Sequence, residues 1–170
     1  MNTRKSLLFA LPLIIALLLI PAGQANAKMV KTYFTGTEVH VEDISAGVET
    51  FPDKNLYHTR DAVEVLAVQT SDSRVSGEDR AIINWNFKLV DPPVYVTGRM
   101  WGTFTISNAD GYWEGTWTGV RDKNGFSYFR FEGQGHGDYK GMKLHMRAQR
   151  LTPDPTQPET ISGYILEPEP

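Results

Sequence analysis

The fold of this chain is decided by residues 98–120, which read GRMWGTFTISNADGYWEGTWTGV. Apolar and polar side chains alternate on both sides of a central Asn108-Ala-Asp-Gly111 turn, and this period of two predicts a β-hairpin. A second turn, Asp122-Lys-Asn-Gly125, carries the Asn-Gly pair that is typical of tight hairpins, and it leads into Phe126–Gln134. The centre of the chain is therefore expected to be an antiparallel meander.

The same alternation extends through the rest of the chain, since no stretch beyond residue 28 keeps a helical period over three turns. Residues 43–61 are expected to form a loop, because Gly47, Pro52, Asp53 and Asn55 interrupt them. The pattern predicts an all-β protein with eight strands: Met29–Val41, Ala62–Gln69, Arg80–Val90, Val94–Ile106, Tyr112–Val120, Phe126–Gln134, Tyr139–Leu151 and Ile161–Leu166.

The glycines indicate how these strands are arranged. Ten of the 15 glycines lie between Gly98 and Gly141, and several of them fall inside predicted strands. Glycine weakens a flat strand, but it suits a sheet that coils sharply or that another group approaches closely. Antiparallel strands must also hide their edges. The sequence therefore favours a single, antiparallel, eight-stranded, closed or nearly closed β-barrel over a sandwich.

Three glycine-rich and aromatic motifs carry a family resemblance: GRMWGTF (98–104), GYWEGTWTG (111–119) and GQGHGDYKG (133–141). In the segment 98–150, which is about a third of the chain and contains these motifs, the chain resembles bacterial secreted proteins related to the allene oxide cyclase barrel-like group, which includes plant dirigent proteins. The resemblance implies an eight-stranded barrel with an apolar cavity. It also implies a barrel that holds a reactive small molecule in one shape during cyclisation or coupling. No catalytic residue of that group is carried over to this chain.

The N-terminus is typical of a secretory signal peptide. Arg4 and Lys5 precede an apolar run from Leu7 to Ile20, and Ala25-Asn-Ala27 offers small residues for cleavage. A run of this length spans about 21 Å, which is short of a hydrocarbon core of about 30 Å. We therefore expect three segments: a cleaved signal peptide (1–27), the barrel domain (28–151), and a proline-rich connection with one last strand and a frayed end (152–170). The protein is expected to be secreted or periplasmic, with no stable membrane insertion after cleavage.

Composition excludes several function classes. The chain has no cysteine, which rules out disulfides and thiolate metal sites. Its net charge is −3, and the sequence contains no run of basic residues that would suit nucleic acid. The four histidines show no metal-binding spacing, although His40 and Glu42 share a face of a regular strand. No phosphate-binding glycine loop precedes a helix. We therefore expect neither a metal nor a cofactor, and no feature of the sequence indicates an oligomeric state.

The alternation sorts the side chains into an apolar face and a charged face. Ile83, Trp85, Phe87 and Leu89 lie on the apolar face, whereas Arg99, Arg130, Glu132, Lys143 and Arg147 lie on the other. An interior lined in this way contains almost no titratable group. The residues expected to line a ligand-binding lumen are Trp85, Phe87, Met100, Phe104, Trp113, Trp117, Phe129 and Phe131.

Glu114 is the candidate catalytic residue. It lies between Trp113 and Trp117 in a glycine-rich strand, where a β-bulge would turn it inward. Burial against indole rings would raise the pKa of its carboxyl group and suit it to acid–base chemistry. The alternative is an outward glutamate in an ordinary cross-strand ion pair.

Three hypotheses about function follow from these features. The first is a barrel that binds a small apolar molecule in its lumen and steers cyclisation or isomerisation by shape. The second is an acid–base cyclase-type isomerase that uses Glu114. The third is a non-catalytic structural or surface-interaction barrel, whose core would be filled by its own side chains.

Overall fold

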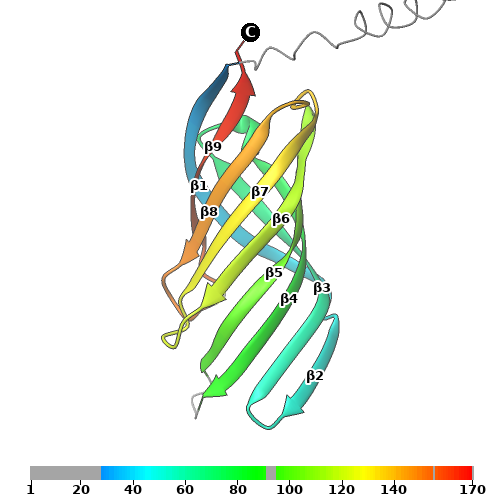
Figure 1. Cartoon of the computed structure of the whole chain (residues 1–170), viewed down its shortest axis with the longest axis vertical. Helices are drawn as coiled ribbons and strands as arrows, with labels where there is room; N and C mark the ends of the chain where they lie inside the picture. Colours follow the sequence, from blue (N-terminus) through cyan, green and yellow to red (C-terminus); the bar gives the residue numbers. More distant parts are fainter. Residues whose placement is uncertain (1–27, 91–94, 155, 170) are drawn as a thin grey trace, which may run out of the picture.

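The computed structural model describes residues 28–90, 95–154 and 156–169, and antiparallel β-strands make up most of them (Figure 1). The predicted signal peptide, residues 1–27, lies outside the described residues. One short 3-10 helix, η1 (Ser73–Val75), separates two of the strands. The strands are β1 (Met29–Ser45), β2 (Val48–Asp53), β3 (Leu56–Thr70), β4 (Gly77–Val90), β5 (Tyr95–Ser107), β6 (Gly111–Arg121), β7 (Ser127–Gly137), β8 (Lys143–Arg150) and β9 (Glu159–Pro168).

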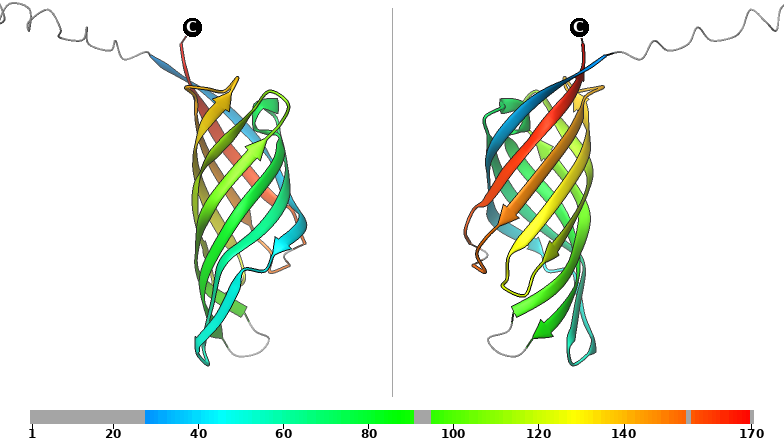
Figure 2. Two further views of the ribbon diagram at one scale, coloured as in Figure 1. Left: turned by 90° about the vertical axis from the view of Figure 1, so that its right-hand side faces the viewer. Right: turned by 60° about the vertical axis from the view of Figure 1, so that its left-hand side comes forward.

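All nine strands belong to one sheet, which closes in a ring through β1. The strand order is β1-β9-β8-β7-β6-β5-β4-β3-β2, with an additional pairing between β1 and β3. The first part of β1 (Met29–Glu38) pairs with β9, whereas the second part (Gly36–Ser45) pairs with β3. One long strand therefore joins the two sides of the sheet, and Figure 2 shows the resulting ring of tilted strands.

The all-β, antiparallel fold is confirmed, but the predicted number of eight strands is wrong. The segment 43–61 is not a loop, because it contains β2 and the first residues of β3. Pro52 lies within β2. A central strand would not tolerate a proline, because proline has no amide hydrogen to donate, but an edge strand does. β2 pairs with β3 at the end of the strand order, and all six of its residues are exposed. The alternation of apolar and polar residues reveals a strand only when one of its faces is buried, so it did not predict the exposed edge strand β2.

The C-terminal strands also differ from their predicted limits. Residues 139–142 form a turn rather than the start of a strand, since the Met142 amide donates to the Tyr139 carbonyl oxygen at 3.0 Å and Gly141 has a φ of +89°. β9 is longer than the predicted Ile161–Leu166, and it pairs with both β8 and β1. The predicted last strand is thus present as β9, and it lies in the ring between β8 and β1.

The predicted division into two faces holds for the central strands. Phe104, Ile106 and Leu144 point into the ring and are at most 1% exposed, whereas the outward Arg99, Arg130 and Arg147 are exposed. Trp101 lies on the outer face, where the Arg60 guanidinium sits 5.0 Å from the centre of its ring. The apolar alternation therefore predicted which side of these strands forms the core.

Glycines inside the strands make room for aromatic rings. A Cβ atom added at Gly133 would lie 2.8 Å from Cζ of Phe104, and one added at Gly119 would lie 2.6 Å from Cδ1 of Phe129. These distances are too short for any side chain. The glycines therefore allow large rings to lie flat against neighbouring strands inside the ring.

Candidate functional site: a cavity in one half of the ring

The interior of the ring is packed solid at one end. This filled half lies where β5 turns into β6 and β7 turns into β8 (Figure 1). Trp113 is fully buried there, its ring stacks on Tyr139 at 5.2 Å, and its Nε1 donates to the Arg74 carbonyl oxygen at 2.7 Å. Leu144 and Ile165 are also 0% exposed. Buried side chains of the described residues therefore occupy this half.

The other half of the ring, which we call the hollow half, holds a cavity of about 610 Å³. Trp85 stacks on Phe87 at 5.5 Å along one side, and Trp117 meets Phe129 edge-on at 5.7 Å on another. The exposed Thr156 at its border shows that the cavity opens to solvent. Its apolar wall consists of Leu66, Ala81, Ile83, Trp85, Phe87, Met100, Trp117, Phe129 and Phe131.

Six of the eight predicted lining residues border this cavity, namely Trp85, Phe87, Met100, Trp117, Phe129 and Phe131. The other two, Phe104 and Trp113, point into the ring but belong to packed regions. Phe104 is 1% exposed and packs edge-on against Phe131, with their ring centres 5.4 Å apart. The sequence identified the inner face, but not where along the strands the packing stops.

Glu114 does not point into the ring. β6 pairs with β5 and β7 without any shift of register, so the bulge that would turn Glu114 inward is absent. The side chain of Glu114 is 62% exposed on the outer face, and its Oε2 lies 3.9 Å from Nε2 of His136. The outward alternative is therefore the correct one, and Glu114 cannot act on a molecule in the cavity.

A band of polar side chains lines the cavity opposite much of the apolar wall. Arg121 of β6 is the register partner of Ser127 of β7, which pairs with Arg150 of β8, and Glu159 of β9 pairs with Glu38 of β1. Arg150 and Glu159 are joined by an ion pair of 2.5 Å between Nη2 and Oε1. We call these five residues the polar belt. It runs across five neighbouring strands, from arginines at one end to carboxyl groups at the other.

The carboxyl groups of this region are buried, and their hydrogen bonds and ion pairs do not fully offset the loss of water around them. Burial raises the pKa of Glu159 to about 6, although the ion pair with Arg150 opposes the shift. Asp79 of β4, which is 1% exposed, has a pKa raised to about 6 by burial, although it accepts a hydrogen bond from the Thr105 amide at 3.2 Å. Burial and the charges of Asp79 and Glu159 raise the pKa of Glu38 well above its usual range. Glu38 and Asp79 are therefore neighbouring carboxyl groups whose pKa values are both raised, mainly by burial.

Several polar atoms at the cavity have no hydrogen-bond partner among the described residues. They are Oε1 of Glu38, Nε1 of Trp85 and the Nε atoms of Arg121 and Arg150. Burial, and then the charge of Arg150, lower the pKa of Arg121. Buried polar groups are normally paired. The cavity therefore presents both donors and acceptors that water or the polar end of a ligand can satisfy.

The expectation of an interior almost free of titratable groups is wrong. The residues of the polar belt and Asp79 share one feature: each continues the inward-facing alternation of its strand past the apolar residues. Ser127 precedes Phe129 and Phe131 by two-residue steps, and Asp79 precedes Ala81 in the same way. The sequence shows these polar residues as the next positions in the alternation of apolar residues. They were missed because every polar residue was assigned to the outer face.

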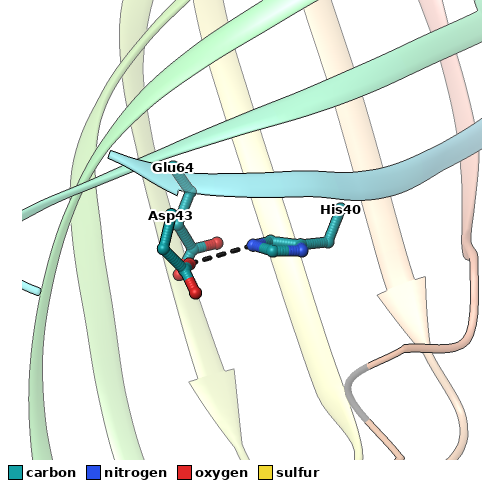
Figure 3. Close-up of side chains that lie close together, drawn as sticks. All are labelled: His40, Asp43 and Glu64. Atoms are coloured by element: carbon teal, nitrogen blue, oxygen red, sulfur yellow. Dashed lines mark hydrogen bonds and ion pairs between the residues drawn. The ribbon is translucent and has the colours of Figure 1, made fainter. Parts of the chain in front are cut away.

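Three further side chains converge at the border of the cavity, as Figure 3 shows: His40, Asp43 and Glu64. The Nε2 atom of His40 lies 2.9 Å from Oδ1 of Asp43. The register shifts between His40 and Glu42, so that Asp43, not Glu42, lies opposite Glu64. The prediction that His40 and Glu42 lie on one face of a regular strand is therefore wrong, because a β-bulge in β1 separates them.

Comparisons of the chain with protein-family models, curated proteins and solved structures found no match. In the described part of the chain, no helix is both long enough and apolar enough to cross a membrane. The geometry of the cavity is therefore the basis for the functional argument.

Proposed function

We propose that this chain is an exported protein that binds one small, mainly apolar molecule in the hollow half of the ring. The observation that carries this proposal is the cavity of about 610 Å³ with an aromatic wall. Ligand pockets of this size are common, and they combine apolar walls with a few polar anchors. The resemblance to the allene oxide cyclase barrel-like group supports the same role.

In the proposed complex, the apolar body of the ligand lies against Trp85, Phe87 and Trp117. Its polar atoms meet the unpartnered Oε1 of Glu38 or Nε of Arg121. Contacts on two sides hold a flexible molecule in one shape, and a ring that fixes shape favours one cyclisation or isomerisation product. The proposed partner is a small molecule, with neither nucleic acid nor a stably inserted membrane.

Binding is tested with N-phenylnaphthylamine, a neutral apolar dye that fluoresces when it leaves water. We expect the dye to bind at micromolar concentration and to change the fluorescence of Trp85 and Trp117. Two neighbouring variants separate the cavity from the surface. Ala81→Phe fills the cavity, whereas Ile82→Phe adds the same ring to a residue that is 40% exposed.

Ala81→Phe is expected to weaken dye binding about tenfold or more, because the added ring takes up space that the dye needs. Ile82→Phe should leave binding unchanged. If Ala81→Phe does not fold, Leu66→Phe tests the same wall from β3. A folded wild-type protein that binds no dye, or equal binding by both variants, would contradict the proposal.

Export is tested separately by expressing the full chain in a bacterial host. We expect the exported product to begin at Lys28, because residues 25–27 carry the predicted cleavage site. A product that keeps residues 1–27 would contradict the proposal of a cleaved signal peptide, and it would leave the binding proposal unaffected.

A second candidate function is acid–base isomerisation, and the pair Glu38–Asp79 favours it. Burial and the charge of Asp79 raise the pKa of Glu38 well above its usual range, whereas Asp79 has a pKa of about 6, so the two neighbouring groups differ in acidity as an acid–base pair requires. A base with a pKa of about 6 is suited to proton abstraction near neutral pH. This pair takes the place of Glu114 in the acid–base hypothesis.

The probe for this chemistry is a nitrobenzisoxazole, whose ring opens when a carboxylate base in an apolar site removes its proton. We expect the wild type to accelerate ring opening about a hundredfold over buffer, as positioned bases do. Asp79→Asn should abolish the acceleration, whereas Glu114→Gln, on the outer face, should preserve it. A wild-type rate equal to that of Asp79→Asn would remove this candidate and leave ligand binding standing.

The third hypothesis, a structural ring with a filled core, has less support. Its packing requirement is met by the filled half, where Trp113 is 0% exposed, but not by the half that holds the cavity. Dye binding at the cavity would argue against it.

A further inference from the structure

The side chains of His40, Asp43 and Glu64 form a compact set of potential metal ligands. One nitrogen or oxygen atom from each lies within 4.8 Å of the other two. Figure 3 shows the imidazole of His40 directed at the two carboxyl groups. Imidazole nitrogen together with carboxylate oxygen is a donor set of zinc and other divalent transition metals.

The backbone of β1 brings this set together. His40 is the register partner of Leu66, and Asp43 is the register partner of Glu64. Leu66 and Glu64 both line the cavity, and so do their partners His40 and Asp43. His40 and Asp43 are three residues apart, and they face the same side because the bulge shifts the alternation of β1. Regular alternation would have placed Glu42 on that face instead. β-bulges commonly re-aim side chains beside functional sites.

The charges around the cluster point independently to a cation. Asp43 and Glu64 lie directly opposite each other on paired strands, where two like charges destabilise a sheet. No lysine or arginine among the described residues forms an ion pair with either carboxylate. A cation held between the two carboxylates would remove their repulsion.

We propose that His40, Asp43 and Glu64 bind one divalent transition-metal ion, with zinc as the type case, at the mouth of the cavity. Three protein ligands leave a coordination position open, as in sites where a metal meets a substrate or water. All three residues also line the cavity, so this position faces the space proposed for a ligand. Magnesium and calcium bind more weakly, because they prefer oxygen ligands in larger number. The proposal does not depend on any cavity ligand.

The test is a calorimetric titration of the untagged full chain with zinc chloride, after dialysis against a chelator. We expect one zinc ion per chain at micromolar affinity. His40→Ala and Glu64→Gln should each weaken binding about tenfold or more, because each removes a ligand. The matched control is the double variant Glu114→Gln/His136→Ala, which removes a histidine–glutamate pair on the outer face and should leave zinc affinity unchanged.

Cobalt(II) gives a second readout, since its visible absorption bands report the ligands that surround it. We expect bands in the wild type that lose their intensity in His40→Ala. His40 is exposed, so its removal leaves the fold intact even if Glu64→Gln does not fold. Equal zinc affinity of wild type and His40→Ala would overturn the proposal. So would binding at millimolar concentration alone, or an equal affinity for calcium.

Discussion

The two halves of the ring interior are built by the same strands, yet they do opposite things. In the filled half, Trp113, Leu144 and Ile165 are completely buried and belong to one apolar core cluster. In the hollow half, the strands continue with aromatic residues, but Glu159 and two arginines lie at strand ends there, and Glu38 faces the cavity from the middle of β1. Burying charge lowers stability unless every group is paired. The difference supports the proposal that the filled half stabilises the fold and that the hollow half binds a ligand.

The largest expected effect comes from removing the central ring of the filled half. Trp113→Ala should lower the free energy of unfolding by about 3–5 kcal/mol, because a buried ring is lost and a cavity remains. Phe129→Ala in the hollow half should cost only about 1–2 kcal/mol, since it enlarges a space that already exists. Urea denaturation of both variants measures the contrast. Equal losses would contradict the division into two halves.

The next effect concerns the ion pair of the polar belt. Arg150→Met leaves Glu159, which is 5% exposed, without its cation, and should lower the free energy of unfolding by about 3 kcal/mol at pH 7. The double variant Arg150→Met/Glu159→Gln should recover most of this loss, because no unpaired charge remains. Denaturation of the wild type, the two single variants and the double variant gives the coupling. A single-variant loss that the double variant does not recover would show that packing, not charge, is responsible.

How far the sequence predicts each half follows from the physics of alternation. The period of two places Phe104, Met100 and Phe131 inside correctly, because burial of one face is what creates the pattern. It fails at the first strand. Val39 and Val41 are 38% and 57% exposed, whereas Glu38 is 3% exposed. The inward face of β1 is set by its pairing with both β9 and β3, and local sequence does not contain that information.

The polar belt and the proposed metal ligand Asp43 were missed for two different physical reasons. Arg121 and Ser127 are inward because strand geometry keeps its phase even where the side chains turn polar. Asp43 is inward because a bulge shifts the phase by one residue. In the first case, the sequence does contain the information, because the period of two leads from Trp117 to Arg121 and from Phe129 back to Ser127. The second case required the register, which no single strand reveals.

The buried carboxyl groups make a smaller, pH-dependent prediction. The pKa of Asp79 is about 6 in the fold, above its value of 3.8 in an unfolded chain. The folded state therefore binds the proton more tightly. The resulting stabilisation is fully present only below the unfolded value of 3.8 and is lost as the pH rises through 6. The part lost between pH 4 and pH 8 is about 2 kcal/mol. Asp79→Asn should flatten this dependence, measured by urea denaturation from pH 4 to 8.

A stability that rises between pH 4 and pH 7 would contradict the predicted sign. Glu38→Gln serves as a further probe, because it removes the carboxyl group that borders Asp79. If the two groups share one proton, Glu38→Gln should also reduce the pH dependence. If it leaves the dependence unchanged, Asp79 titrates independently of Glu38.

The smallest effect is expected at Glu114, on the outside of the ring. Its contact with His136 is 3.9 Å long and exposed, and Tyr112 stacks on the same imidazole at 4.5 Å. Glu114→Gln should therefore change the free energy of unfolding by less than about 0.5 kcal/mol. It should also leave dye binding and zinc affinity unchanged. A loss of dye binding in this variant would mean that Glu114 reaches the lumen in solution, and the division between a charged outside and a ligand-binding hollow half would fail at β6.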